Sequence, residues 1–158
     1  EVGYFGAYKS TIRNIMPLYF AAKDRKIKLN ICGYSDILLE DTQSISIHGV
    51  IPYEYALKME EESDILICIC NNKGTQIPGK IYYCTSYKKP IIVVLDGEYT
   101  EELREYFSGF NRFILCENNK ESIIDAIGRA KAQIKKQEYI ICEKLTPEYM
   151  ARKILRYL

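Results

Sequence analysis

A glycine followed closely by two cationic side chains is the first group in the sequence that could do chemistry. Gly6 ends a short apolar segment, and Lys9 and Arg13 come soon after it. Glycine lets a diphosphate approach the backbone, and lysine and arginine can neutralise the charge of the phosphates. An ordinary turn with solvated charges would give the same pattern, so this motif alone leaves both interpretations open.

A second glycine-rich segment, GTQIPGK, occupies residues 74–80. It matches the first part of the phosphate-binding pattern G-x-x-x-x-G-K. Ile81 stands where that pattern needs a hydroxyl for magnesium, and Pro78 lacks the amide N–H that would contact phosphate. We therefore reject an ATPase loop. A glycine-rich loop that opens a helix is still a suitable anion site, because free amides and the helix dipole point at the ligand.

The other conspicuous polar groups favour structural roles. His48 is the only histidine, which excludes a site built on several histidines, and at a strand end it is interpreted as structural. The carboxylates at residues 60–62 are expected on a solvated helix end. The tyrosines near Tyr83 predict core packing with hydroxyls at the edge.

Composition and cysteine spacing exclude several classes of protein. The net charge of +1, from 22 basic and 21 acidic residues, gives no footprint for nucleic acid. The longest apolar runs are too short to cross a bilayer, and the start carries no signal-peptide pattern and no initiator Met. The six cysteines form no C-x-x-C pair and lie mostly among Ile, Leu and Val. We expect no metal, a reduced cytoplasmic protein, and a chain that begins inside a longer one.

Strand-like and helix-like segments alternate along the chain. The strands are predicted at residues 2–6, 27–32, 44–48, 64–70, 90–95 and 112–116. The helices are predicted at residues 10–24, 53–62, 79–87, 100–107 and 120–136, and a last one begins at residues 146–148.

This alternation predicts an α/β, Rossmann-like, three-layer fold. A six-stranded parallel sheet in the order 3-2-1-4-5-6 would carry helices on both faces. Strands one and four then meet at the topological switch, where ligands bind past the carboxyl ends of the strands. The loops at residues 6–10 and 71–79 should therefore face each other. We assign residues 1–144 to this domain and residues 145–158 to a carboxyl-terminal helix.

Three stretches resemble the carboxyl-terminal domain of retaining glycosyltransferases with the GT-B fold, of the group 1 type. Residues 2–13, VGYFGAYKSTIR, are similar to the opening strand and phosphate loop of that domain. Residues 49–66 resemble its turn, helix and following strand. Residues 77–92 resemble the family pattern iPxKiyEYlaxxkPii and are the most specific of the three.

The resemblance implies a site for a nucleotide-diphosphate sugar donor, with no cofactor, no metal and no assigned catalytic residue. The base would lie by Gly49, Val50 and Ile51. The diphosphate would lie by Gly6, Lys9, Arg13, Thr75, Gln76, Ile77, Pro78, Gly79 and Lys80. Tyr83 and Thr75 stand where the family commonly has two glutamates, one of which holds the donor ribose.

The resemblance also implies a bacterial enzyme of polysaccharide biosynthesis, which moves a sugar to a polysaccharide or lipid-linked acceptor. The amino-terminal acceptor domain would be missing here, so this half alone should be inactive. The last helix would pack toward that domain, and the full-length protein could sit peripherally on the inner membrane.

Two alternatives stay open. One is a non-catalytic domain of the same fold, which the change at Tyr83 favours. The other is a protein similar to nucleoside deoxyribosyltransferases, which would need a carboxylate nucleophile from Asp36, Asp41 or Asp96.

Overall fold

The computed structural model describes residues 1–136 and 142–155. The strands are β1 (Val2–Phe5), β2 (Leu29–Cys32), β3 (Ile45–Gly49), β4 (Ile65–Ile69), β5 (Ile91–Leu95) and β6 (Ile114–Glu117). The helices are α1 (Met16–Arg25), α2 (Tyr53–Glu62), α3 (Gly79–Cys84), α4 (Thr100–Ser108), α5 (Lys120–Lys136), the 3-10 turn η1 (Glu143–Leu145) and α6 (Pro147–Leu155).

The six strands form one parallel sheet in the order β3-β2-β1-β4-β5-β6. This confirms the predicted fold class and strand order. β4 and β5 are buried along their whole lengths, as their unbroken apolar sequences require in a sheet covered on both faces. The reversal of strand order falls between β1 and β4, so the loops that follow these two strands lie at the same end of the sheet, where ligands of such folds bind.

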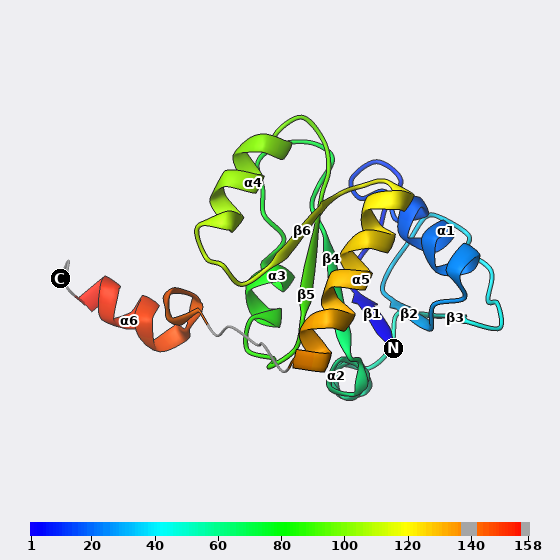
Figure 1. Ribbon diagram of the computed structural model, residues 1–158, viewed down its shortest axis with the longest axis horizontal. Helices are drawn as coiled ribbons and strands as arrows, with labels where there is room; N and C mark the ends of the chain where they lie inside the picture. Colours follow the sequence, from blue (N-terminus) through cyan, green and yellow to red (C-terminus); the bar gives the residue numbers. More distant parts are fainter. Residues whose placement is uncertain (137–141, 156–158) are drawn as a thin grey trace.

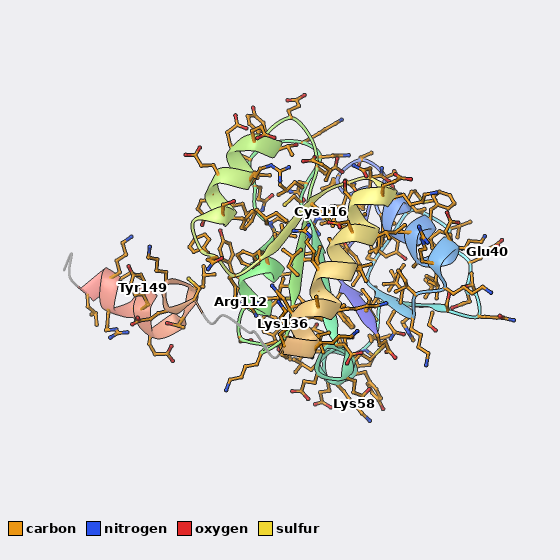
Figure 2. The ribbon with its side chains drawn as sticks, in the orientation of Figure 1. Glu40, Lys58, Arg112, Cys116, Lys136 and Tyr149 are labelled. Carbon is orange, nitrogen blue, oxygen red and sulfur yellow. The ribbon has the colours of Figure 1, made fainter. Side chains whose placement is uncertain are left out.

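Helices cover both faces of the sheet. One apolar cluster joins the sheet to α1 and α5, through side chains such as Leu18 and Ile127. The second cluster joins the other face to α3 and α4, through Ile81 and Phe107, with Met59 of α2 packed against it. Figure 1 shows α5 and α1 in front of the strands. α5 runs back against the strand direction, so Cys116 on β6 and Lys136 at the end of α5 lie toward opposite ends of the strands (Figure 2).

The first helix begins later than predicted, at Met16 instead of residue 10. In a helix that began at residue 10, Pro17 would remove a backbone hydrogen bond and press its ring against the carbonyl of Arg13. Asn14 Oδ1 instead accepts from the backbone N–H of Met16 at 3.1 Å. Lys9 and Arg13 therefore lie in a loop before α1, not in its first turn.

Helix α3 ends at Cys84 and is shorter than the predicted segment, which reached Tyr87. Thr85 Oγ1 donates to the carbonyl of Tyr82 at 2.5 Å, and Ser86 Oγ donates to the carbonyl of Tyr83 at 3.0 Å. These hydroxyls satisfy carbonyls that another helical turn would have used, which favours termination. The six strands and the other helices lie within a few residues of their predicted bounds.

Helix α6 lies beside the sheet rather than over either of its faces (Figure 1). Its Ile154 and Leu155 are 60% and 68% exposed. Met150 and Leu158, which were predicted on the same apolar stripe, lie outside the side chains that the structure describes. The division at residue 144 stays a prediction.

Candidate functional site

The loops after β1 and β4 are joined directly by hydrogen bonds. Arg13 Nε donates to Asn71 Oδ1 at 2.9 Å, and the backbone N–H of Asn72 donates to the carbonyl of Ile12 at 2.7 Å. The two loops meet at the carboxyl edge of the sheet, because they follow neighbouring parallel strands. The loops after β1 and β4 therefore meet as predicted, through residues 12–13 rather than 6–10, and a binding cleft between them stays a prediction.

Arg13 is the centre of this contact. Its Nη1 donates to the carbonyl of Ala7 at 2.9 Å, in addition to the bond from Nε to Asn71. A guanidinium has five N–H donors, so further donors remain for a ligand. A Cβ added to Gly6 would lie 4.0 Å from Arg13 Nη1, which places the glycine beside the cation. The predicted pair of Gly6 and Arg13 therefore occupies one place.

Lys9 lies on the outer side of the same loop. Its Nζ is 4.9 Å from the centre of the Tyr34 ring, a cation–π distance. The next residue, Ser10, donates to Asp36 from both its backbone N–H and its hydroxyl, each at 2.8 Å. These bonds lower the pKa of the Asp36 carboxyl, the backbone bond contributing most. The loop after β2 thus holds Lys9 near the carboxyl edge of the sheet.

A close approach of two backbones supports this edge. Gly33 has a φ of +147°, and a Cβ there would lie 2.0 Å from the carbonyl oxygen of Gly6. Its backbone N–H donates to the carbonyl of Gly49 at 2.7 Å. Gly33 therefore ties the ends of β1, β2 and β3 together. Sequence reasoning used this residue only as the end of a strand, although a glycine directly after a buried strand at the switch is a signal for such an approach.

The loop before α3 is open to solvent on its outer side. Residues 73–76 are exposed, whereas Pro78 is buried. Gly74 has a φ of +69°, and a Cβ at Gly74 or Gly79 would meet no atom within 4 Å. Asn71 Nδ2 donates to the carbonyl of Gln76 at 3.3 Å and draws the loop back toward Arg13. Thr75, Gln76 and Ile77 therefore lie on the loop that borders the Arg13 contact.

Lys80 makes a different contact from the one that was predicted. Its Nζ forms an ion pair with Glu60 of α2 and lies 4.4 Å from the centre of the Tyr83 ring. Glu60 is only 2% exposed, and its other carboxylate oxygen accepts from the Tyr87 hydroxyl at 3.1 Å. The carboxylate neutralises Lys80, so this lysine offers less charge to a phosphate than Lys9 or Arg13.

The prediction that residues 60–62 are all solvated is wrong for Glu60 and correct for its two neighbours. Glu60 follows Ala56 and Met59 on one helical face, a spacing that could have indicated its burial. Lys89 Nζ closes the end of α2, because it donates to the carbonyls of Glu60, Glu61 and Ser63 at 2.6–2.8 Å. Burial lowers the pKa of Lys89.

The predicted base region lies at the end of β3. Gly49 has a φ of +60°, Val50 is 76% exposed, and Ile51 packs partly against the second apolar cluster. His48 Nε2 lies 2.9 Å from Asn30 Oδ1 on the neighbouring strand, which agrees with its structural interpretation. This region is separated from the loop after β4 by β2 and β1 in the sheet.

The three candidate nucleophiles of the deoxyribosyltransferase alternative all accept hydrogen bonds that hold loops together. Asp36 binds Ser10, and Asp41 Oδ1 accepts from the backbone N–H of Ile47 at 2.8 Å. Asp96 accepts from Asn118 Nδ2 at 2.7 Å and from the N–H of the next residue at 2.9 Å. Within residues 1–136 and 142–155, no group of three His, Cys, Asp or Glu side chains could hold a metal ion.

The fold just described defines a class, the three-layer α/β proteins whose parallel sheet reverses its strand order between β1 and β4. No protein-family model matches the chain, and no curated protein matches its sequence. Its fold is similar to a crystal structure from Listeria monocytogenes of a protein assigned as a UDP-N-acetylglucosamine 2-epimerase, with a TM-score of 0.57 and 12% sequence identity. The similarity covers 98% of this chain and 43% of that one, so the chain spans less than half of the similar protein.

The described helices include none that is both long and apolar enough to cross a lipid bilayer.

Proposed function

We propose that this chain is the donor-binding half of a glycosyltransferase that uses a nucleotide-diphosphate sugar. The observation that carries the proposal is the contact between Arg13 and Asn71, which places a cation with unused donors at the topological switch. The motif at residues 77–92 and the similarity in fold to the Listeria protein support the same class of ligand.

In this proposal the diphosphate lies between the loops after β1 and β4. Arg13 would donate to phosphate oxygens, Lys9 would add charge, and the backbone of residues 74–79 would supply amides. Transfer of the sugar leaves a nucleoside diphosphate and places positive charge on the sugar, so these donors would stabilise the leaving group. Such stabilisation needs no metal or cofactor.

The base would lie by Gly49, Val50 and Ile51, at the end of β3. Tyr83 replaces the carboxylate that the resemblance predicts for the donor ribose, and its hydroxyl lies 3.4 Å from that of Tyr53. Tyr83 is 40% exposed. A pair of phenol hydroxyls can donate to and accept from ribose hydroxyls, which is the role that we assign to them.

The acceptor would bind an amino-terminal domain of the full-length protein, which would transfer the sugar to a polysaccharide or lipid-linked acceptor. We place the protein in the cytoplasm, on the inner membrane surface when it meets such an acceptor. The cysteines support a reducing compartment, because those at positions 32, 68, 70, 84 and 116 are free and buried.

Calorimetry with a panel of nucleotides tests the proposal. Nucleoside diphosphates and their sugar conjugates should bind, and the matching nucleoside monophosphates should bind at least about tenfold more weakly, since they lack a charge-assisted phosphate contact. Equal affinity for both classes would place the phosphates elsewhere and contradict the proposal.

Two observations favour the second candidate, a non-catalytic domain of the same fold. The buried carboxylate of Glu60 neutralises Lys80, and Tyr83 removes a carboxylate from the same helix. A domain that has lost donor chemistry would keep its fold and bind none of the panel. The same calorimetry therefore separates the two candidates.

A further inference from the structure

An open surface cavity of about 480 Å³ runs along α1, from Asn14 to Asp24, beside the amino-terminal end of α5. These two helices pack side by side at one face of the sheet (Figure 1). The polar part of the lining comes from Asn14 and Asp24 on one side and from Asn118, Asn119 and Lys120 on the other. None of these residues belongs to the donor site proposed above.

The amide of Asn118 leaves one buried acceptor in this cavity wall. Its Nδ2 donates to the carbonyl of Asn14 at 2.9 Å and to Asp96 Oδ2 at 2.7 Å. The opposite amide orientation would set Oδ1 against two oxygen atoms, so these bonds fix the orientation shown. Oδ1 is buried and has no hydrogen-bond partner among the described residues. An unpaired buried acceptor is costly, so Asn118 keeps an unmet hydrogen-bonding capacity beside the cavity.

The other polar side chains of the cavity lining provide hydrogen-bond donors, and their charges sum to zero. The Oδ1 atoms of Asn14 and Asn119 each accept from a backbone N–H at the start of their own helix, at 3.1 and 2.9 Å. Their Nδ2 groups are thereby left as donors. Lys120 Nζ is 2.9 Å from Asp24 Oδ2, so the only two charges in the lining cancel. The cavity thus combines donors with acceptors and has no charge excess that would select an anion.

Phe20 adds an apolar surface to this polar set. It lines the cavity and is 46% exposed, and its ring meets the neighbouring Tyr19 ring edge-on at 5.7 Å between centres. A sugar has hydroxyls that both donate and accept, together with an apolar C–H face that can cover an aromatic ring. We propose that this cavity is a binding site for a neutral sugar unit, held by Phe20 and the amides of Asn14 and Asn119.

The location of the cavity connects it to the donor crevice. Asn14 directly follows Arg13, so the Asn14 end of the cavity borders the proposed diphosphate site. The sugar could come from the donor or from the acceptor, and the chemistry of recognition is the same for both. The inference goes beyond the proposed function, because its evidence is the cavity and would stand for a protein that binds no nucleotide.

Nuclear magnetic resonance titration tests the site directly. Neutral mono- and disaccharides should shift the side-chain amide signals of Asn14, Asn118 and Asn119 in a saturable way. Phe20→Ala should weaken the binding about tenfold, as expected for the loss of one buried aromatic contact. Tyr55→Ala is the matched control, since Tyr55 is 65% exposed on α2 and should leave the affinity unchanged. Absence of saturable shifts with every sugar, or equal affinity of Phe20→Ala and the wild type, would overturn the inference.

Two further titrations separate the sources of the sugar and keep the donor proposal distinct. A nucleotide sugar that displaces the free sugar, when the plain nucleoside diphosphate does not, identifies the cavity as the site of the donor's sugar. Free sugar that stays bound beside the nucleotide sugar identifies an acceptor unit. Shifts of the backbone amide signals of Gly6 and Lys9 with nucleoside diphosphate alone report on the proposed donor site. The two proposals can therefore be contradicted independently of each other.

Discussion

Arg13 Nε lies 2.9 Å from Asn71 Oδ1, although 58 residues separate the two along the chain. The bond joins the loops after the two central strands and orients the guanidinium at the carboxyl edge of the sheet. A single side chain therefore joins the two loops and places a positive charge where they meet.

We predict that Arg13→Ala weakens the binding of nucleoside diphosphate by about 1.5–3 kcal/mol, the usual contribution of a hydrogen bond to a charged group. Arg25→Ala is the control, because Arg25 is an exposed arginine at the other end of α1. Calorimetry on the full-length protein measures both variants. If Arg13→Ala binds nucleoside diphosphate as tightly as Arg25→Ala does, Arg13 does not contribute to the donor site.

Gly33 should tolerate no side chain. Its φ of +147° is strained for any other residue, and a Cβ would collide with the carbonyl of Gly6. Gly33→Ala should therefore destabilise the fold by about 2–4 kcal/mol in urea unfolding. Gly128→Ala is the opposite case, since Gly128 lies in α5 with open space around its Cβ position. It should stabilise the fold by about 0.5–1 kcal/mol. Similar effects of the two substitutions would show that the backbones at Gly6 and Gly33 can separate at little cost.

The sheet, the Lys80–Glu60 pair and the start of α1 show which features could be predicted from the sequence and which could not. Continuous apolar segments and alternation are local patterns, so the parallel sheet, its strand order and the meeting of the loops after β1 and β4 followed from them. The pairing of Lys80 with Glu60 depends on how α2 and α3 pack, which no local pattern states. Pro17 indicates that α1 starts late, but the sequence does not show the hydrogen bond from the Met16 N–H to Asn14 Oδ1 that accompanies this start.

The stability of the loop at Ser10 should depend on pH. The hydrogen bonds from Ser10 lower the pKa of Asp36 below its ordinary value of 3.8, so they stabilise the folded state above that value. This contribution is lost as the pH falls through the lowered pKa. Ser10→Ala removes the hydroxyl bond, so the pKa of Asp36 should move back toward 3.8 in this variant. The variant should be less stable than the wild type at neutral pH, and this difference should shrink on acidification. A carboxyl titration by nuclear magnetic resonance and urea unfolding at neutral and acidic pH measure the two effects. Ser122→Ala is the control, because Ser122 does not contact Asp36. A stability difference between Ser10→Ala and the wild type that grows in acid would contradict the role assigned to the bonds from Ser10 to Asp36.

The cysteines should differ sharply in reactivity. Burial raises the pKa of Cys70 and Cys116 to about 12 and that of Cys32 to about 11, so their thiols stay protonated at mildly alkaline pH. Thiol reagents attack the thiolate. Cys142 is the one partly exposed cysteine among the described residues. We predict that an aromatic disulfide reagent modifies about one thiol in the folded protein and all six in denaturant. Cys142→Ser is the control and should lose the single fast reaction. Rapid modification of several thiols would show instead that the core opens readily.

The last prediction concerns transfer itself, which the 158-residue chain should not carry out alone. The proposed crevice is built from loops of one domain, and the chain spans less than half of the similar Listeria protein. Groups that hold the acceptor and orient the reacting sugar would come from the other part of a full-length enzyme. Positioning contributes roughly 7–11 kcal/mol for well-oriented reactants, so a half-site should lose most of the rate.

The test compares this chain with the full-length protein, using labelled nucleotide sugars and a panel of acceptors. The chain should bind the donor with an affinity similar to that of the full-length protein, because Arg13 and Asn71 meet within it. It should show no transfer above the rate without protein. A variant shortened after residue 136 is the matched control for α6, whose Ile154 and Leu155 are exposed here. It should bind the donor unchanged, because α6 contributes no residue to the proposed crevice. Transfer by the chain at a rate comparable to that of the full-length protein would mean that this domain alone holds a complete active site.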